Sequence, residues 1–519
     1  MRFSERVGDR ARRGSSSPLT PATMKRLLAA AAVLAPIAAS VWAADRPVIE
    51  SHVDQERIEK GDVSFDALFQ AGRFLFNARF NKADGQGRPA SMGHGAPRTA
   101  SQPAFTRMSG PDSNSCEGCH FQPRSGGAGD FATNVFVLAQ ERDPVVTAFD
   151  PRDGTERNSL GMNGSGAIEL LSREMTRELV ATREAALAEA KTSGHDVRKP
   201  LVAKGVSFGQ VLALPDGRID PREIAGVDWD LVIKPFHQKG AVVSLREFTV
   251  TAMNHHHGMQ PVERFGKGVD ADKDGVVDEL SEGDITAVTV YQAGLNLPGR
   301  KLPFEPERRA AAVRGERVFA EVGCGSCHVP ELPLDDAVFT EPGPFNPPGN
   351  LRAQDRGVKS LFRFDLSKDT TAPRVYKHGR GYVVRAFTDL KRHDLNDGTY
   401  AHFANERAPQ GFLHGVAPTA AFTEPTRPRP LREFLTRKLW DAGSSAPYGH
   451  RGDLTTMTEA INFHGGEARA IRDRYFTLPE ADQDAVVEFL KTLQVLPEGS
   501  PPVITEAKDE NPLRARVKN

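Results

Sequence analysis

The sequence predicts a mainly α-helical protein with two domains, long loops and little β-structure. Three observations lead to this prediction. Apolar residues recur at helical spacing between positions 165 and 191, no long stretch alternates apolar and polar residues, and one five-residue motif occurs near the start of each half of the chain. At 519 residues the chain is too long for one ordinary core, so at least two domains are expected.

The composition describes a globular protein without a strongly charged surface. Hydrophobic residues make up 39% and charged residues 26% of the chain, and the formal net charge is −1. This balance provides no general electrostatic attraction to nucleic acid or to an anionic membrane. Neither is therefore expected as a partner.

Residues 1–44 are predicted to lie outside the folded protein. Lys25 and Arg26 precede an apolar run from Leu27 to Trp42, which has the length and flanks of a secretory signal peptide. Residues 1–23 are interpreted as an upstream extension. An uncleaved N-terminal anchor helix is the alternative. We expect export to the periplasm without stable membrane insertion.

All four cysteines belong to the repeated motif. The two copies consist of Cys116, Cys119, His120, Cys324, Cys327 and His328. The pattern C-x-x-C-H is the signature of covalent haem attachment. Its two thiols lie about one helical turn apart and reach one edge of a porphyrin, while the following imidazole faces the iron. We predict two covalently bound haem c groups, with both histidines as iron ligands.

Cysteine pairs of this kind have two other known roles. A C-x-x-C pair can form a redox disulfide, and four cysteines with histidines can bind zinc. A redox pair does not need a histidine directly after it in both copies. A zinc site would have to join motifs more than two hundred residues apart.

The motifs divide the chain into predicted domains joined near residues 297–300. Residues 45–299 form an N-terminal haem domain, residues 300–497 a C-terminal cytochrome c-like haem domain, and residues 498–519 a tail. In the N-terminal half, a helix from Ser165 to Lys191 is capped by Ser165 and stopped by Gly194. A small hairpin follows near 206–217.

Prolines, glycines and the second motif indicate where the elements of the C-terminal half begin and end. A helix over 314–322 leads into the second motif. Proline and glycine place loops at 341–349 and 425–430. Helices are predicted at 430–439, 456–463 and 479–493.

An acidic segment before the second domain resembles the start of an EF-hand loop. Its expected calcium ligands are Asp270, Asp272, Asp274, the carbonyl of Val276, and Asp278. Gly275 stands at the sharp turn, but Ser281 replaces the usual bidentate glutamate. We predict a structural Ca²⁺ here; an acidic surface turn is the alternative.

Several segments carry a family resemblance. Besides the haem motifs these are residues 244–247, 260–263 and 446–452, with the last stretch reading Ala-Pro-Tyr-Gly-His-Arg-Gly. Together they resemble the bacterial di-haem cytochrome c peroxidase and MauG superfamily. Residues 232–236 and 254–260 resemble more narrowly its di-haem oxidoreductase branch, also called thiol-oxidoreductase-like. The resemblance covers most of the mature chain.

The resemblance implies a set of roles. His464 stands where the superfamily provides the distal ligand of the C-terminal haem, and Glu247 resembles the distal carboxylate that assists peroxide cleavage. His256 or His257 is expected near the first haem as a ligand or a proton carrier. A helix-end histidine, a surface glutamate and exposed histidines are the corresponding alternatives.

The chain also departs from the superfamily. His237 stands where the peroxidases have a tryptophan between their haems, and the accompanying arginine is absent. The histidine that caps the resting N-terminal haem has no counterpart either. That haem is expected to be open or to take a ligand from elsewhere, such as the histidine cluster or Met162.

The resemblance implies a periplasmic peroxidase-like oxidoreductase. Electrons from a small periplasmic donor protein would enter at the C-terminal haem, and peroxide or another oxidisable substrate would react at the N-terminal haem. A non-enzymatic electron-transfer cytochrome is the main alternative. A third is an enzyme that oxidises a protein substrate, as MauG-like members do.

Overall fold

The computed structural model describes residues 46–87, 112–134, 156–358, 360–396 and 433–508. From Pro47 onward the chain forms one compact unit, which contains both C-x-x-C-H motifs. The predicted loop at 425–430 lies outside the described residues.

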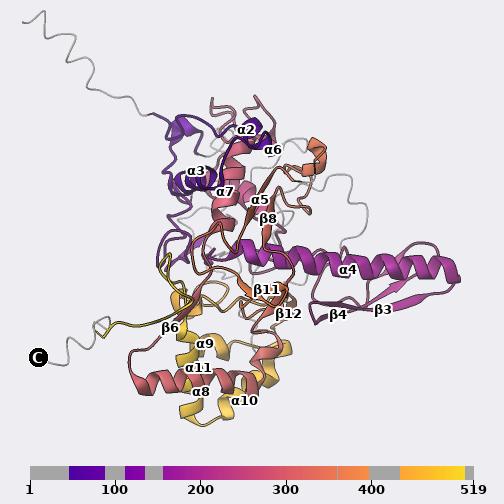
Figure 1. Ribbon diagram of the computed structural model, residues 1–519, viewed down its shortest axis with the longest axis vertical. Helices are drawn as coiled ribbons and strands as arrows, with labels where there is room; N and C mark the ends of the chain where they lie inside the picture. The colour runs from indigo at the N-terminus through magenta and orange to yellow at the C-terminus, as the bar shows by residue number, and fades with distance from the viewer. Residues whose placement is uncertain (1–45, 88–111, 135–155, 359, 397–432, 509–519) are drawn as a thin grey trace, which may run out of the picture. The chain divides into compact units, whose positions relative to one another are not determined.

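Helices and short strands alternate along the described chain (Figure 1). The α-helices are α2 (Gln55–Glu59), α3 (Phe65–Asn77), α4 (Ser165–Ser193), α5 (Leu245–Ala252), α6 (Val262–Phe265), α7 (Glu282–Gly294), α8 (Pro306–Val322), α9 (Met457–Asn462), α10 (Arg469–Thr477) and α11 (Glu480–Thr492). A π-helix, η5 (Met253–His257), continues α5. The strands are β1 (Ala132–Asn134), β2 (Glu156–Asn158), β3 (Val197–Ala203), β4 (Val206–Ala213), β5 (Ile219–Asp220), β6 (Gly299–Leu302), β7 (Leu332–Leu334), β8 (Val338–Glu341), β9 (Phe362–Asp365), β10 (Tyr376–His378), β11 (Gly381–Val384), β12 (Arg392–Asp394), β13 (Glu433–Leu435), β14 (Leu493–Gln494) and β15 (Val503–Thr505).

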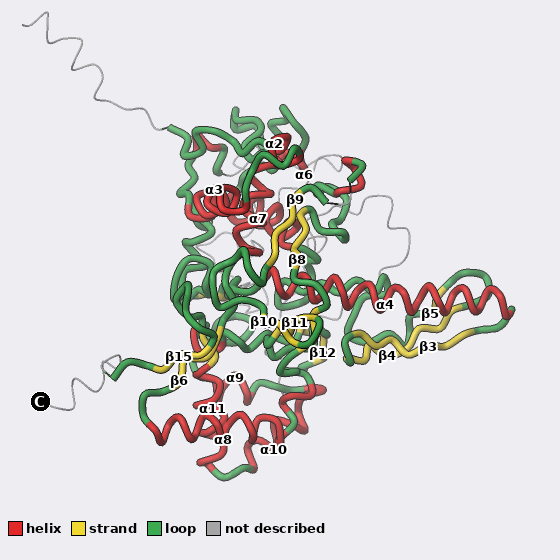
Figure 2. Tube along the Cα trace, viewed as in Figure 1, coloured by secondary structure: helices red, strands yellow, loops and turns green. Residues whose placement is uncertain are grey.

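The prediction of a mainly α-helical fold with little β-structure is wrong. Six small sheets of two or three strands join segments of the described chain, and helices and strands are interspersed (Figure 2). The predicted helix at 430–439 is also wrong where it is described, because β13 pairs antiparallel with β12 there. Strand formation depends on the neighbour with which a strand pairs, so strands this short leave little periodic signal.

Other predicted elements are confirmed. Helix α4 spans Ser165–Ser193 and is stopped by Gly194 at its C-cap, but its N-cap is Gly164 rather than the predicted Ser165. The predicted hairpin forms between β4 and β5, and β3 extends it to a three-stranded sheet beside α4. Helices α9 and α11 occupy the two predicted segments at 456–463 and 479–493.

A pair of closely packed helices accompanies each haem motif. Helix α3 precedes the first motif and crosses α7, where a Cβ on Gly72 would lie 1.9 Å from the carbonyl oxygen of Ala287. Helix α8 precedes the second motif and crosses α11, where a Cβ on Gly315 would lie 1.8 Å from the carbonyl oxygen of Ala485. Only glycine permits such contact, so both crossings depend on the absence of a side chain.

Among the described residues, the buried core has one large cluster, one smaller cluster and a third around Phe434 and Leu454. The large cluster joins the N-terminal half to residues of β7, β8, β9 and β11 and to Trp440. The smaller cluster fills the space between α8, α10 and α11. Near the predicted domain boundary, β6 pairs with β14 and with β15 from the predicted tail.

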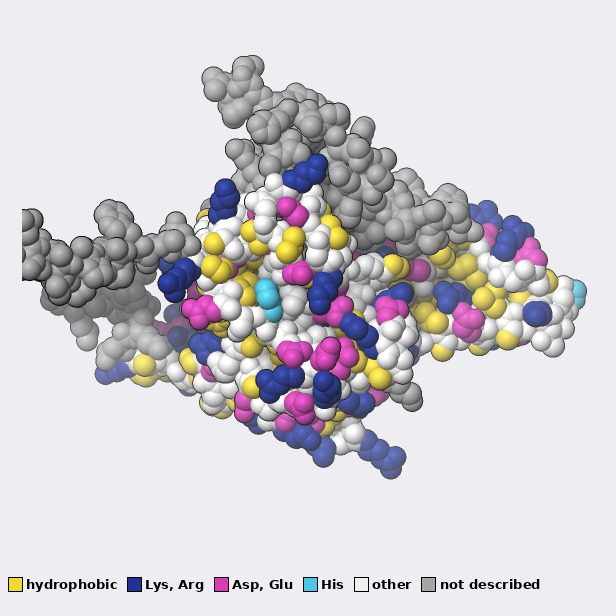
Figure 3. All heavy atoms as spheres, turned by 90° about the horizontal axis from the view of Figure 1, so that it is seen from above, with side chains coloured by type: hydrophobic (Ala, Val, Ile, Leu, Met, Phe, Trp, Pro, Cys, Tyr) yellow, Lys and Arg dark blue, Asp and Glu magenta, His cyan; other side chains and the backbone are white. Residues whose placement is uncertain are grey.

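Charged side chains of both signs are mixed on the face of the molecule that Figure 3 shows. On the face in Figure 3, basic and acidic groups alternate without a large patch of one sign. Among the described residues, no helix combines the length and the apolar character needed to cross a membrane.

Candidate functional site

One cavity reaches both C-x-x-C-H motifs. Its volume is about 590 Å³, and residues from both halves of the chain line it. His120 of the first motif and Cys324, Cys327 and His328 of the second lie on its wall. The two motifs therefore face a common interior space.

The first motif forms a tight turn beside the cavity. The backbone N–H of His120 donates to the carbonyl of Cys116 at 3.0 Å, and Nδ1 of His120 lies 3.0 Å from the carbonyl oxygen of Leu160. Burial lowers the pKa of His120 to about 4, so the imidazole is neutral in neutral solution. With Nδ1 donating to Leu160, Nε2 carries the lone pair that binds a metal.

The second motif repeats this arrangement. The backbone N–H of His328 donates to the carbonyl of Cys324 at 3.0 Å, and Nδ1 of His328 lies 3.1 Å from the carbonyl oxygen of Phe387. Burial lowers the pKa of His328 to about 4 as well. Each histidine is thus oriented by a carbonyl outside its own motif, as iron-ligating histidines usually are.

His464 lies opposite His328. It follows α9, and its Nδ1 lies 2.7 Å from the carbonyl oxygen of Ala460. The ring centroids of His328 and His464 are 6.3 Å apart. Two imidazole nitrogens that share one metal ion at about 2 Å each lie about 4 Å apart, and their ring centroids lie farther apart than that. The spacing therefore fits two axial ligands of one iron.

Glu247 lines the cavity from the first turn of α5. Its Oε2 accepts a hydrogen bond from the backbone N–H of Val243 at 2.7 Å. Its own N–H donates to Oγ of Ser244, the N-cap of the helix, at 3.1 Å. These bonds hold the carboxylate at the start of α5, where the helix dipole favours negative charge.

Arg246, the neighbour of Glu247, is fully buried away from solvent. Its guanidinium contacts Glu263 at 2.9 Å and Glu341 at 2.7 Å. It also donates to Thr286 at 2.9 Å. Sequence reasoning missed this network because its members come from α5, α6, α7 and β8.

The histidine cluster lies in the π-helix η5, a type of segment that is often found at functional sites. His255 and His256 line the cavity, and their ring centroids are 4.8 Å apart. Nδ1 of His256 lies 2.9 Å from Oδ2 of Asp112. The positive charge that His256 carries when protonated lowers the pKa of His120 further, after the larger effect of burial.

His257 points to a different place. It is absent from the described wall of the cavity. Its Nδ1 lies 2.7 Å from the carbonyl oxygen of Ser113, and its Nε2 lies 3.6 Å from Sγ of Cys116. Burial lowers the pKa of His257 to about 4. His257 therefore contacts the first C-x-x-C-H turn itself.

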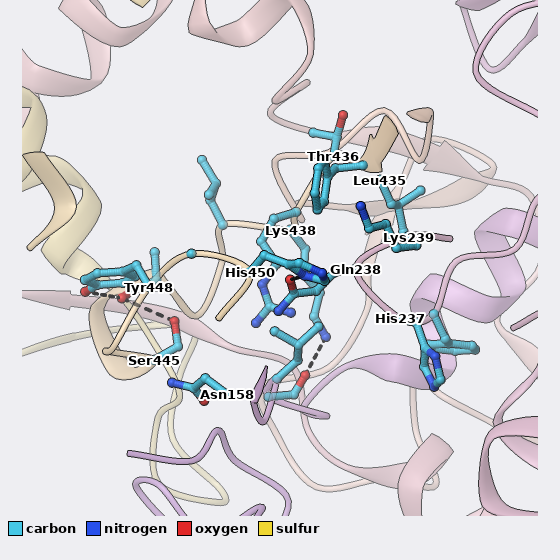
Figure 4. Close-up of a pocket in the computed structure, with 18 of the residues that line it drawn as sticks. Asn158, His237, Gln238, Lys239, Leu435, Thr436, Lys438, Ser445, Tyr448 and His450 are labelled. Atoms are coloured by element: carbon cyan, nitrogen blue, oxygen red, sulfur yellow. Dashed lines mark hydrogen bonds between the residues drawn. The ribbon is translucent and has the colours of Figure 1, made fainter. Parts of the chain in front are cut away.

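The cavity wall also contains polar groups that sequence reasoning did not single out (Figure 4). Gln238 is hydrogen-bonded to His450, and Nζ of Lys438 donates to the carbonyl of Gly161 at 2.8 Å. Burial lowers the pKa of Lys438 to about 8. His237, at the position of the missing tryptophan, lies on the same wall, and burial lowers its pKa to about 4. No local motif distinguishes Lys438 from the other lysines.

His393 is a further group near the second motif. It lies 2.8 Å from Asp389 and 2.8 Å from Glu467. Burial alone would lower its pKa, but the hydrogen bonds to the two carboxylates outweigh it and raise the pKa to about 11. His402 and His414 lie outside the described residues.

The acidic loop brings together three of its predicted calcium ligands. One oxygen each from Asp270, Asp272 and Asp274 lies within 4.8 Å of the others. Burial raises the pKa of Asp272 to about 7 and that of the neighbouring Glu279 to about 9. Asp278 accepts a hydrogen bond from the backbone N–H of Gly268 at 2.6 Å.

The residues at both motifs fit covalently attached haem. All four cysteines are free thiols. Each thiol pair is followed by a neutral, oriented histidine on or beside an interior cavity. Two thiols that can bond to the porphyrin edge and an imidazole that can bind the iron are the groups that haem c requires. Met162 also lines the cavity.

Comparisons with known proteins bear on the C-terminal segment. Residues 414–493 match the model of a family described as "Di-haem oxidoreductase, putative peroxidase". This match contains His464 and the 446–452 stretch. A cytochrome-c peroxidase, IdrP2 of Pseudomonas sp. (strain SCT), is 30% identical over 119 residues, which are 22% of this chain and 30% of that protein.

Two solved structures show remote similarity. Hydrazine synthase of Kuenenia stuttgartiensis is 15% identical with a TM-score of 0.34, over 88% of this chain and 97% of that one. A MauG-like protein associated with microbial copper homeostasis is 17% identical with a TM-score of 0.26, over 54% of this chain and 77% of that one.

Proposed function

Because this chain belongs to the superfamily of di-haem peroxidases and MauG, as its family match at residues 414–493 and its cytochrome-c peroxidase relative indicate, we propose that it is a periplasmic di-haem c-type oxidoreductase with peroxidase-like activity. Electrons from a small periplasmic donor protein enter at the C-terminal haem, and the substrate reacts at the N-terminal haem. The signal-peptide-like segment after Met24 supports export.

The observation that carries this proposal is the asymmetry of the cavity. His328 faces His464, a second histidine oriented to share its iron. On the cavity wall that His120 shares with η5 and α5 stand Glu247, His255 and His256 instead. The second motif also has an imidazole held by carboxylates, His393, so the difference lies in His464. A site closed by two histidines would suit electron storage, whereas Glu247 and His256 would be available for proton transfer at the other site.

The proposed cofactors are two haem c groups and one Ca²⁺. Cys116 and Cys119 attach the first haem and Cys324 and Cys327 the second, while His120, His328 and His464 bind iron. When bound, the haem groups supply the redox-active iron. The acidic loop holds the calcium ion.

The protein side of the reaction is proton transfer. Reduction of hydrogen peroxide to two waters consumes two electrons, from the donor protein, and two protons. We assign Glu247 and His256 to carrying these protons, because both stand on the cavity wall and Asp112 holds Nδ1 of His256. His257 faces Cys116 rather than the cavity, so we assign it to positioning the haem-attachment turn.

Spectroscopy of the protein produced with cytochrome c maturation factors tests the proposal. Electron paramagnetic resonance spectra are recorded in the resting and half-reduced states, before and after hydrogen peroxide. We expect a high-spin ferric signal from one haem that disappears with peroxide, and a low-spin signal from the other. Two low-spin haems that are indifferent to peroxide in both states would overturn the proposal in favour of an electron-transfer cytochrome.

Variants assign the chemistry to residues. Glu247→Gln and His256→Gln are each expected to lower the rate of peroxide consumption by about 10²–10⁴ with both haems retained. Glu56→Gln, at a solvent-exposed glutamate of α2, is the matched control and leaves the rate unchanged. Wild-type rates in both cavity variants would refute the assignment.

A further inference from the structure

The acidic loop is connected to the histidine cluster through one side chain, Gln260. Its Nε2 donates to Oδ1 of Asp272 at 2.8 Å and to Oε1 of Glu279 at 2.6 Å. Its Oε1 accepts from the backbone N–H of Ala271 at 2.8 Å. Its backbone N–H donates to Oε2 of Glu279 at 2.8 Å. Gln260 is itself buried, so the connection lies inside the protein.

One carboxylate oxygen of Asp272 is hydrogen-bonded to Gln260, and the other has no hydrogen-bond partner. The residue is fully buried, and Oδ1 accepts the hydrogen bond from Gln260. The other oxygen, Oδ2, is buried and makes no hydrogen bond. A buried carboxylate oxygen without a partner is costly. Because one oxygen from each of Asp270, Asp272 and Asp274 lies within 4.8 Å of the others, a cation bound among the three would provide this carboxylate with a partner.

The backbone geometry of the loop supports the same ion. Asp270 accepts hydrogen bonds from the backbone N–H groups of Lys273 and Gly275 at 2.6 and 3.1 Å. These bonds curl the loop and bring alternate carboxylates to one side. Three carboxylates at alternate positions of such a turn are the ligand pattern of Ca²⁺, which takes six to eight oxygens, with water and backbone carbonyls completing the shell.

The segment on the other side of Gln260 is the histidine cluster. Two hydrogen bonds close η5: the N–H of Gly258 donates to the carbonyl of Asn254 at 3.1 Å, and the N–H of Met259 to that of Met253 at 3.1 Å. The side chain of Asn254 donates to the carbonyl of Met259 at 3.1 Å. Residues 253–260 therefore form one hydrogen-bonded unit that ends at Gln260.

From these contacts we infer that a Ca²⁺ bound by Asp270, Asp272 and Asp274 holds the histidine segment 253–260 in place through Asp272 and Gln260. The ion neutralises the cluster and fixes Asp272, which orients the Gln260 amide, as outer-shell groups do around metals. The inference takes the Ca²⁺ of the acidic loop from the proposed function, and it does not depend on the haem chemistry proposed there.

Calorimetry tests the ion site in the full chain with both haems attached. After treatment with a chelator, titration with CaCl₂ is expected to show one site with a Kd on the order of 10⁻⁴ M or tighter. Asp272→Asn, which keeps an oxygen for Gln260, is expected to raise the Kd at least about tenfold. Asp274→Asn is a second variant in case the first does not fold. Asp66→Asn, at an exposed position of α3, is the control. Failure of the wild type to bind Ca²⁺ at about 1 mM would refute the site.

Hydrogen exchange measured by mass spectrometry tests the positioning role. We expect removal of Ca²⁺ to speed exchange at the amides of Gly258, Met259 and Gln260 by about tenfold or more, with no change in α8. In Asp272→Asn exchange there is fast with or without Ca²⁺. Calcium binding that leaves these amides unchanged would overturn the positioning role. Loss of haem without loss of calcium binding would instead count against the proposed function alone.

Discussion

Replacement of Arg246 by methionine provides a sharp test of how the site is supported. Arg246 is fully buried, and its carboxylate partners are 3% exposed in Glu263 and 1% in Glu341. Removal of the guanidinium leaves two buried carboxylates without a counter-ion. Breaking a buried pair from one side costs about 3–5 kcal/mol. This is a large part of a total stability of about 5–15 kcal/mol.

The loss of folding stability in Arg246→Met should depend on pH. Burial already raises the pKa of Glu341 to about 7, against the attraction of Arg246. Without the arginine, both glutamates bind protons more tightly in the folded than in the unfolded protein, where their pKa is about 4.5. The folded state then holds more protons than the unfolded state above that pH. The variant therefore regains stability relative to the wild type as the pH falls toward 4.5.

Urea unfolding of the haem-loaded protein measures this effect. The expected fall in the free energy of unfolding of Arg246→Met is about 3–5 kcal/mol at neutral pH and less at about pH 5. Arg218→Met is the control, because Arg218 is 76% exposed and pairs with Asp216 on the surface; it should cost less than about 1 kcal/mol. Adding Glu263→Gln and Glu341→Gln to Arg246→Met should recover part of the loss. A cost below about 1 kcal/mol for Arg246→Met would refute the reasoning.

Three further predictions concern single positions. Gly258→Ala should lower the free energy of unfolding by more than about 2 kcal/mol, because φ is 72° and a Cβ would lie 1.6 Å from the carbonyl oxygen of Gly87. The control Gly217→Ala, in open space with a φ of 88°, should lower it by about 1 kcal/mol. Equal losses for the two variants in urea unfolding would contradict the predicted contact with Gly87. His52→Gln should lower the free energy of unfolding by up to about 1 kcal/mol near pH 5 and leave it unchanged near pH 9. The hydrogen bond to Asp284 raises the pKa of His52, so the stabilisation is present at low pH and is lost as the pH rises through that pKa. A pH-independent difference between variant and wild type in urea unfolding would contradict this prediction. His464→Ala should convert the low-spin paramagnetic resonance signal of the C-terminal haem to high-spin, whereas His378→Ala, at an exposed histidine of β10, should not; an unchanged spectrum would remove His464 as a ligand.

The fold was predictable only where local signals are strong. Residues 165–191 have a long apolar periodicity that is followed by Gly194, and the structure has a helix there that Gly194 stops. By contrast, β12 and β13 are three residues each and pair across about forty residues of chain. Their stability comes from each other, so neither segment carries its own pattern.

The candidate site divides in the same way. The haem motifs and the acidic loop are compact in sequence, so their residue types and spacing predict their chemistry. Which way Arg246, Glu247 and the three histidines point was not predictable. His256 faces the cavity and His257 faces Cys116, because successive side chains of a helical segment point in different directions.

The sequence alone determined the chemical identity of the parts: two C-x-x-C-H turns, an acidic loop with calcium-ligand spacing, and a histidine at position 464. Covalent chemistry and metal ligation need particular atoms at short spacing, which a sequence records directly. Only the tertiary structure decided that the two motifs share one cavity, that His464 faces His328, and that Gln260 joins the acidic loop to the histidine cluster. These relations depend on long-range packing, in which each contact is chosen by a partner far away in the chain.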